Sequence, residues 1–361
     1  MGDASSPPRA SRHALLHDPS STALLPLRII THNIRFANTT PEKHECLWED
    51  RFPHLSSHFK YHTRPHFAPP STLVCMQEVL HRQLQDLINH TFNTSKSSTV
   101  STTGNEAGPV GAGDNDWTYV GVGRDDGKTK GEYSPIFFRK SAWKLLHFET
   151  VWLNETGEVG KKGWDASSIR ILSCAVLESV HQSSVPAGQG HAHPSDGHGI
   201  VLALNTHLDD QGVVSRREAT KLILTVASRL KSKFSPQFTF LAGDLNSRPD
   251  GDAYQLLNSA GSGFIDVRRL ITDNKNAGGK LYAYSNERTF TGFAGDPGAG
   301  GRHRIDFIHI GVSDTGATEE DDKLKELVQC YGVLPSRFDD QVWMSDHRAV
   351  VVDLLLPTGS N

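Results

Sequence analysis

Short apolar runs rich in β-branched and aromatic residues recur along the chain, and Gly, Pro, Asn and Asp separate them. Runs of this length between turn residues predict β-strands. The predicted strands are Leu27–Ile34, Leu73–Val79, Trp117–Gly121, Ile136–Phe138, Trp143–Trp152, Ile169–Leu177, Ile200–Thr206, Gln237–Ala242, Ile305–Ile310, Leu327–Val333 and Ala349–Leu356.

Helical periodicity is confined to a few segments. The most regular runs from Ser215 to Lys231 and places its apolar residues on one face. Ser215 and Glu218 predict a capping box at its start. Shorter helices are predicted over His81–His90 and Asp252–Asn258.

The segments between these elements are predicted as surface loops. They are the His-rich 37–70, the Ser/Thr/Gly-rich 93–116, the His/Gly/Ser-rich 181–199, the Gly-rich 292–303 and the acidic 313–326. The five histidines of 37–70 could form a zinc site. Their irregular spacing and the lack of Cys partners favour a solvated or partly packed loop instead.

Composition sets the class of protein. The chain has 361 residues, 37% hydrophobic and 22% charged, which is enough for a large core, and length alone suggests about two domains. No apolar run of membrane-spanning length occurs. Residues 1–26 lack a continuous apolar stretch, so we expect a disordered tail and no signal peptide.

Charge and cysteine content limit the cellular compartments and binding partners to be expected. Cys75 and Cys174 lie within strand-like runs, and the four cysteines form no disulfide framework. A reducing, intracellular compartment (cytoplasmic or nuclear) is therefore expected. The net charge of −4, with no run of Lys and Arg, argues against tight duplex binding and against a polybasic membrane-surface segment.

The octet GDLNSRPD at 243–250 follows the predicted strand Gln237–Ala242. Asp244 and Asn246 are two residues apart, so an extended chain would point both side chains the same way. Such a pair is either a turn device, since all these residue types favour turns, or part of a site.

Other predicted strands also end in, or contain, polar groups. These are Asn33, Glu78, His207, Asp306, Asp346 and His347. Most have a structural alternative when taken singly, such as a helix cap for Glu78 or a satisfied core histidine for His207. Asp306 is harder to explain structurally, because a carboxylate within Ile-Asp-Phe-Ile needs a buried partner.

Together these residues form a coherent chemical set. Asn33, Glu78, Asp244 and Asp346 offer the hard oxygen ligands that Mg²⁺ prefers. His207 and His347 can donate hydrogen bonds to phosphoryl oxygens, and Asp306 can orient His347. This inventory predicts metal-assisted hydrolysis of a phosphoester.

The ordered motifs resemble those of the endonuclease/exonuclease/phosphatase superfamily and span nearly the whole chain, from Asn33 to His347. The resemblance implies a DNase I-like α/β fold: a four-layer sandwich of two packed mixed sheets with helices outside. It also implies one domain over 27–357, whereas length alone suggests about two domains.

The same resemblance implies roles for the site residues. Asp244 would orient or deprotonate the attacking water, and Asn246 would hold that water or a phosphoryl oxygen. Glu78, with Asn33 and Asp346, would hold Mg²⁺, for which Mn²⁺ is expected to substitute.

Two further residues resemble narrower family features. Glu132 in GEYSPIFFRK would pair with His207, the alternative being an exposed loop carboxylate. Arg170 matches a phosphate-binding arginine, the alternative being a structural ion pair with Asp165. The segments around these residues, with TFTGF, resemble a branch found in bacteria and fungi.

Three functions remain open at this point. The first is a phosphodiesterase acting on nucleic acid or nucleotide, which most branches of the superfamily use. The second is a hydrolase of a small phosphorylated metabolite or lipid headgroup, which the acidic net charge favours slightly. The third is a non-catalytic binding module, against which the complete residue set argues. We expect a monomer.

Overall fold

The computed structural model describes residues 24–93, 116–180, 199–272, 283–293, 303–312 and 318–357. Residues 1–23 of the predicted tail lie outside this range. In the described part, both ends of the chain enter the same sheet, because Leu24 pairs with Pro357.

The first sheet has seven strands and is mixed. Its order is β10 (Tyr284–Ser285), β12 (Val328–Val333), β13 (Val350–Pro357), β1 (Leu24–Asn33), β2 (Leu73–Gln77), β4 (Ile136–Arg139) and β3 (Trp117–Val120). Strand β1 is its centre: it runs parallel to β2 and antiparallel to β13.

The second sheet has six strands. Its order is β5 (Trp143–Trp152), β6 (Ile171–Ser179), β7 (Ile200–His207), β8 (Phe238–Asp244), β11 (Asp306–Gly311) and β9 (Phe264–Asp266). Strands β7 and β8 are parallel, so their C-terminal ends, which carry polar residues, lie at the same edge of the sheet. Strand β11 is antiparallel to β8 and begins where β8 ends.

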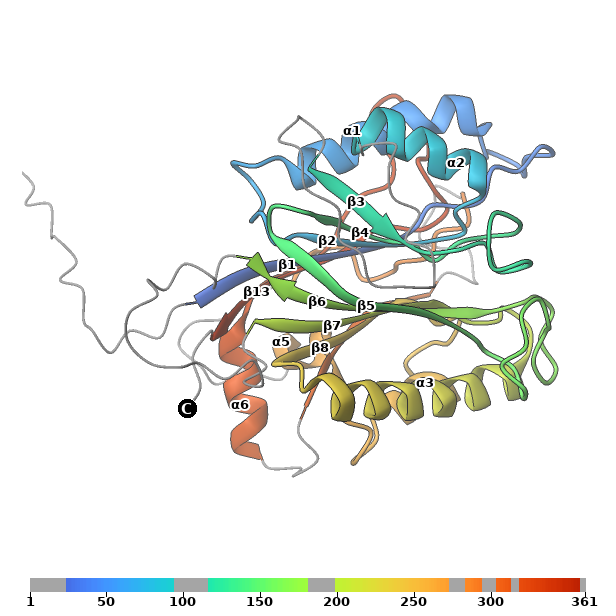
Figure 1. The fold of residues 1–361 in the computed structure, drawn as a ribbon. Helices are drawn as coiled ribbons and strands as arrows, with labels where there is room; N and C mark the ends of the chain where they lie inside the picture. The colour runs from blue at the N-terminus through green and yellow to red at the C-terminus, as the bar shows by residue number, and fades with distance from the viewer. Residues whose placement is uncertain are drawn as a thin grey trace, which may run out of the picture.

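The two sheets pack face to face over an apolar core, and helices cover their outer faces (Figure 1). Helices α1 (Trp48–Thr63) and α2 (His81–Asp86), with a π-helical turn over Leu87–Thr91, lie on the first sheet; α3 (Val213–Phe234) and α4 (Asp252–Leu257) lie on the second. Helix α5 (Val267–Thr272) contacts strands of both sheets, and α6 (Thr318–Leu327) contacts α5 and the first-sheet strands β12 and β13. The predicted four-layer α/β sandwich is confirmed.

A pair of amide side chains crosses the core near the carboxyl ends of β2 and β7. Gln77 of the first sheet donates to Asn205 Oδ1 of the second at 2.7 Å. Asn205 Nδ2 in turn donates to the carbonyls of Met76 and Pro135, both at 2.9 Å. Both amides are fully buried, and two of these groups have a second partner: Gln77 Nε2 also donates to Thr31 Oγ1, and the Pro135 carbonyl also accepts from the Met76 nitrogen.

Replacing Asn205 with Ala is therefore expected to destabilise the fold. The change takes one hydrogen-bond partner from the Gln77 amide nitrogen and one from each of the Met76 and Pro135 carbonyls, and each such bond contributes about 0.5–1.5 kcal/mol. Urea denaturation should show at least this loss in the free energy of unfolding. Asn89→Ala, at an exposed position, is the control and should change stability by no more than about 0.5 kcal/mol. Equal stability of the two variants would contradict the argument.

Two predicted loops are wrong because they contain helices. The His-rich segment contains the whole of α1, whose Trp48, Leu55 and Phe59 are buried against the first sheet. The acidic segment overlaps α6, whose Leu324 is buried. In both cases tertiary packing of a few apolar residues outweighs a polar composition. Within the described part of the chain, the α1 histidines form no cluster of three metal-ligating side chains.

The start of α3 also differs from the prediction. The helix begins at Val213, so Ser215 lies inside its first turn and the predicted capping box with Glu218 is wrong. Asp165, far away in the sequence, accepts from the backbone nitrogens of Val214 and Ser215 instead. No local pattern could indicate this cap.

Two other features match the sequence prediction. Cys75 and Cys174 are buried, and all four cysteines are free. Among the described residues, every helix is too short or too polar to cross a bilayer.

Candidate active site

The ends of strands from both sheets meet at one mouth of the sandwich. Asn33 ends β1 and Glu78 directly follows β2, while His207 and Asp244 end β7 and β8. The register places His207 beside Asp244, and Asp306, the first residue of β11, opposite Asp244. The parallel pairs β1–β2 and β7–β8 thus bring residues from distant parts of the chain to one place.

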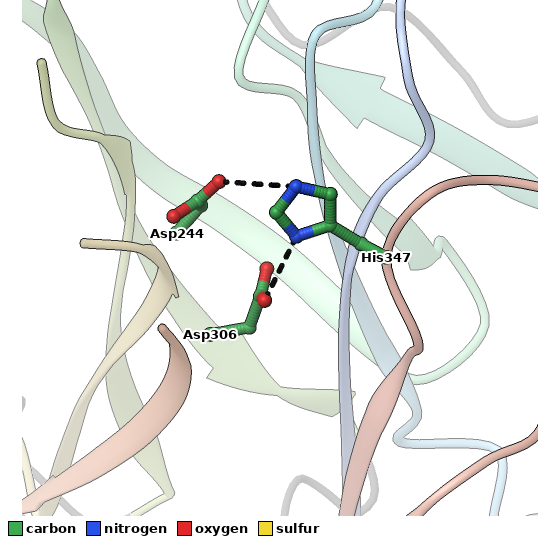
Figure 2. Close-up of side chains that lie close together, drawn as sticks. All are labelled: Asp244, Asp306 and His347. Carbon is green, nitrogen blue, oxygen red and sulfur yellow. Dashed lines mark hydrogen bonds and ion pairs between the residues drawn. The ribbon is translucent and has the colours of Figure 1, made fainter. Parts of the chain in front are cut away.

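The imidazole of His347 lies between two carboxylates (Figure 2). Its Nδ1 is 2.9 Å from Asp306 Oδ2, and its Nε2 is 3.7 Å from Asp244 Oδ2. Burial alone would lower the pKa of His347, but the charges of Asp306 and Asp244 raise it well above its ordinary value. These two carboxylates favour the protonated ring, which can donate from both nitrogens.

Asp306 and His347 are held by their own neighbours. Thr289 Oγ1 accepts from the backbone nitrogens of Ile305 and Asp306, both at 3.0 Å, which fixes the start of β11. Ser345 Oγ accepts from the backbone nitrogen of His347 at 3.1 Å. The structure brings together the buried carboxylate and the histidine donor that the sequence predicted as a pair.

Asn33 links the carboxylates of the two sheets. Its Nδ2 donates to Glu78 Oε1 at 2.9 Å and to Asp244 Oδ2 at 3.0 Å. Its Oδ1 accepts from the backbone nitrogen of Arg35, so it is already engaged. In this arrangement Asn33 acts on the carboxylates through its nitrogen, which differs from the oxygen-ligand role expected of it. Glu78 has a φ of 59°, and its Oε2 accepts from the nitrogen of Phe36.

Asp346 lies on the loop before β13, next to His347. Its backbone carbonyl accepts from the nitrogen and the hydroxyl of Thr291, at 2.6 and 2.7 Å. Burial, together with the negative charge of Glu78, raises the pKa of the Asp346 carboxyl to about 6. Burial and the charge of Asp306 likewise raise the pKa of Asp244 to about 7.

Burial is the main cause of both shifts, and the neighbouring carboxylates add to them. Glu78, Asp346 and Asp244 offer hard oxygen donors, and the chemistry of this donor set fits Mg²⁺. Asp244, Asp306 and His347 form the tightest cluster of ligand-type atoms in the described residues, within 4.8 Å of one another. In that cluster the His347 ring is ion-paired with both carboxylates, and a protonated imidazole offers no lone pair to a metal.

The octet GDLNSRPD is both a turn and part of the site. Asp244 Oδ1 accepts from the backbone nitrogen of Asn246 at 2.8 Å, which is the turn device. Asp244 Oδ2 instead faces the histidines. Asn246 has a φ of 45°, a conformation that Asn tolerates, and its Nδ2 donates to the carbonyl of Leu208 at 2.9 Å.

His207 is a neutral histidine in contact with this turn. Its Nε2 is 3.0 Å from Asn246 Nδ2 and 3.5 Å from Asp244 Oδ2. Burial lowers its pKa well below the ordinary value, and the nearby arginines Arg170 and Arg124 add to the effect. Because the amide nitrogen of Asn246 donates to Nε2, the ring proton is on Nδ1.

Glu132 lies near His207 but has a stronger partner. Its Oε2 is 3.8 Å from His207 Nδ1 and accepts from Arg124 at 2.7 Å. Burial raises the pKa of Glu132 to about 7. The exposed-loop alternative for Glu132 is wrong, because the side chain is only 16% exposed.

Arg170 forms an ion pair, but the predicted partner is wrong. Its Nε is 3.3 Å from Asp209 and its Nη2 is 3.0 Å from Asp210, whereas Asp165 caps α3. Asp209 and Asp210 lie two and three residues after His207, the last residue of β7. Arg170 directly precedes β6, whose first residues pair with the end of β7, so the two carboxylates lie within its reach. The phosphate-binding role of Arg170 stays a prediction.

Several residues of the site were not assigned a role from the sequence. Arg124 carries the cation beside Glu132, and its Nε is buried without a hydrogen-bond partner. Thr289 and Thr291 hold the two loops that carry Asp306 and Asp346. The spacing of the two threonines in TFTGF could have indicated their role, since residues two apart in an extended chain place both hydroxyls on one side.

A mouth built from strand ends of two packed sheets, with a histidine between carboxylates, defines a DNase I-like phosphoester hydrolase. Comparison with known proteins agrees, although no family model matches the sequence and no curated protein matches it. The chain belongs to the endonuclease/exonuclease/phosphatase superfamily, as its structural neighbours show.

Three solved structures illustrate the match. A family protein from Bacteroides vulgatus has 26% sequence identity and a TM-score of 0.66, over 92% of this chain and 99% of that one. Mannosyl-6-phosphatase from Bacteroides thetaiotaomicron has 25% identity and a TM-score of 0.65, over 91% and 99%. D. rerio TDP2, complexed with a single-strand DNA product, has 16% identity and a TM-score of 0.56, over 91% and 98%, and shows the fold alone.

Proposed function

We propose that this protein is a Mg²⁺-dependent phosphodiesterase acting on nucleic acid or nucleotide. The observation that carries the chemistry is the His347 imidazolium between Asp306 and Asp244, beside the carboxylates of Glu78 and Asp346. It combines a cationic donor, a carboxylate base and hard oxygen ligands in one mouth.

Each side chain has a defined task in this proposal. Asp244, whose pKa is raised to about 7, takes a proton from the attacking water. Asn246 holds that water or a phosphoryl oxygen, and His207 holds the Asn246 amide in place by accepting from its nitrogen. His347 donates to the phosphoryl oxygens as their negative charge grows, and Asp306 keeps its ring oriented and charged.

Glu78 and Asp346 would hold the metal ion. When bound, Mg²⁺ supplies Lewis-acid polarisation of the phosphoryl group. Asn33 keeps Glu78 and Asp244 at a fixed distance by donating to both. Arg124 adds a cation close to His207 and becomes a second candidate, beside Arg170, for contact with the phosphate.

Activity is expected to stop in EDTA and to return with excess Mg²⁺ or Mn²⁺. Glu78→Gln keeps the shape of the side chain but removes its charge, so the Mg²⁺ concentration for half-maximal activity should rise about tenfold or more. Bis(p-nitrophenyl) phosphate hydrolysis measured against Mg²⁺ concentration checks this. The control is Glu178→Gln, an exposed carboxylate on β6. Full activity in EDTA would rule out the metal-dependent mechanism.

A second substrate class has its own support. Mannosyl-6-phosphatase is more similar in sequence to this chain than D. rerio TDP2 is, which favours a small sugar phosphate. Parallel assays with mannose 6-phosphate, a single-stranded oligonucleotide and bis(p-nitrophenyl) phosphate separate the two candidates. The substrate with the highest kcat/KM identifies the class, and a strong preference for the monoester would replace the phosphodiesterase proposal.

A further inference from the structure

A cavity of about 580 Å³ opens beside the candidate active site, and its most common lining residue is arginine. We call it the arginine pocket and define it by Arg248, Arg268, Arg269, Arg288 and Arg304. Its volume lies within the range of small-molecule sites.

The pocket is strongly cationic in a protein that is acidic as a whole. Asp250 and Glu287 are the carboxylates that line it, against five guanidinium groups, while the whole chain has a net charge of −4. Guanidinium groups stay charged at physiological pH, so five of them around one space favour the binding of an anion.

The ion pairs of the pocket arginines differ in burial and therefore in strength. Arg304 donates to the buried Asp266 at 2.7 Å, which anchors it in the fold. Arg248 pairs with Asp250, but both side chains are more than half exposed, and such surface pairs contribute little to stability. Glu287, 3.6 Å from Arg268, is 84% exposed.

The wall of the pocket is continuous with the candidate active site. Arg248 lies two residues after Asn246 in the turn that follows β8. Arg304 lies two residues before Asp306, and Arg288 precedes Thr289, whose hydroxyl holds the Asp306 nitrogen. A substrate bound at Asp306 and His347 can therefore extend along the same backbone segments into the pocket.

We propose, resting on the phosphoester hydrolysis proposed above, that the arginine pocket binds a second phosphate group of the substrate. Arginine forks match phosphate oxygens in bidentate geometry, and the pocket offers several of them around one space. The substrate is then one with at least two phosphates. The second phosphate comes either from the next link of a nucleic acid strand or from a doubly phosphorylated small molecule.

The test uses Arg248→Gln, Arg269→Gln and Arg288→Gln in combination, which spares the anchored Arg304. A matched control removes three exposed basic residues from α3, by Arg217→Gln, Lys221→Gln and Lys233→Gln. Urea denaturation checks that both variants fold, and Arg269→Gln alone replaces the triple variant if that one is unstable. The substrates are a short oligothymidylate, a hexose bisphosphate and bis(p-nitrophenyl) phosphate, which has a single phosphate.

We expect the pocket variant to raise KM about tenfold or more for a substrate with several phosphates, with kcat little changed. KM for bis(p-nitrophenyl) phosphate should stay as in the wild type, and the control variant should behave as the wild type throughout. A response with oligothymidylate identifies the nucleic acid strand as the source, and a response with the bisphosphate alone identifies the small molecule. No response with either, or the same response with all three, would overturn the proposal.

Failure of the proposed function is detected separately. If the wild-type protein hydrolyses none of these substrates, binding of fluorescein-labelled oligothymidylate and of the bisphosphate is measured in EDTA, without turnover. Weaker binding by the pocket variant, with a shallower dependence on salt concentration, would still support the second-phosphate site. Equal binding by both proteins would reject it.

Discussion

Asp244→Asn is expected to lower kcat by about 10²–10⁴-fold, the usual loss when a general base is removed. The carboxylate ends β8 with one oxygen in the turn to Asn246 and the other facing His207 and His347. The asparagine side chain can keep the turn, because its oxygen can still accept from the Asn246 nitrogen. What it loses is the capacity to take a proton.

The measurements are steady-state kinetics on bis(p-nitrophenyl) phosphate and urea denaturation of the same preparation. The free energy of unfolding should fall by about 1–3 kcal/mol, because the new amide nitrogen at the Oδ2 position faces the donors of Asn33 and His347. Asp252→Asn, an exposed carboxylate at the start of α4, is the matched control and should keep wild-type kcat. A loss of only a few-fold in Asp244→Asn would leave the turn as the whole role of this residue.

Asp306→Asn and His347→Ala are each expected to cost about 10²-fold or more in kcat, and the double variant should be little worse than the poorer single one. The two residues form one unit through the 2.9 Å contact between Nδ1 and Oδ2. Without the Asp306 carboxylate, one of the main charges that raise the pKa of His347 is lost, so burial disfavours the protonated ring that it offers to the phosphoryl group.

A double-mutant cycle on kcat measures this coupling. Strictly additive losses would show that the residues act independently and that the pairing has no part in catalysis. Asp353→Asn is a suitable control, because Asp353 is also ion-paired on a strand, with Arg28, but belongs to β13 away from its site end. It should leave kcat unchanged.

The positions of most strands along the chain, and the residues at their ends, could be predicted because both depend on the local sequence pattern. The strand Gln237–Ala242 and the octet after it match β8 and its turn closely. Asp306 was recognised as needing a partner because burial of a carboxylate has a large cost wherever it occurs. The motif order then supplied His347, which the structure places next to it.

What could not be predicted depends on contacts between distant segments. Helix α1 forms because Trp48 and Phe59 pack on a sheet, although the segment is rich in His and Ser. Arg170 contacts Asp209 and not Asp165, since the register of β6 and β7 decides which carboxylate is near. The nitrogen-donor arrangement of Asn33 depends on Asp244, which is 211 residues away in the sequence.

The amide pair Gln77–Asn205 gives the sandwich a property that a purely apolar core lacks. Apolar faces can slide across one another with little directional preference. A buried hydrogen bond between two side-chain amides forms only when the two sheets have one particular relative position. Gln77 is adjacent to Glu78, and Asn205 is two residues from His207, so this bond sets how far the two halves of the mouth can shift. A shift of one sheet relative to the other should therefore abolish activity before the apolar core unfolds. Catalytic activity should then report the relative position of the sheets more sensitively than a spectroscopic measurement of folding.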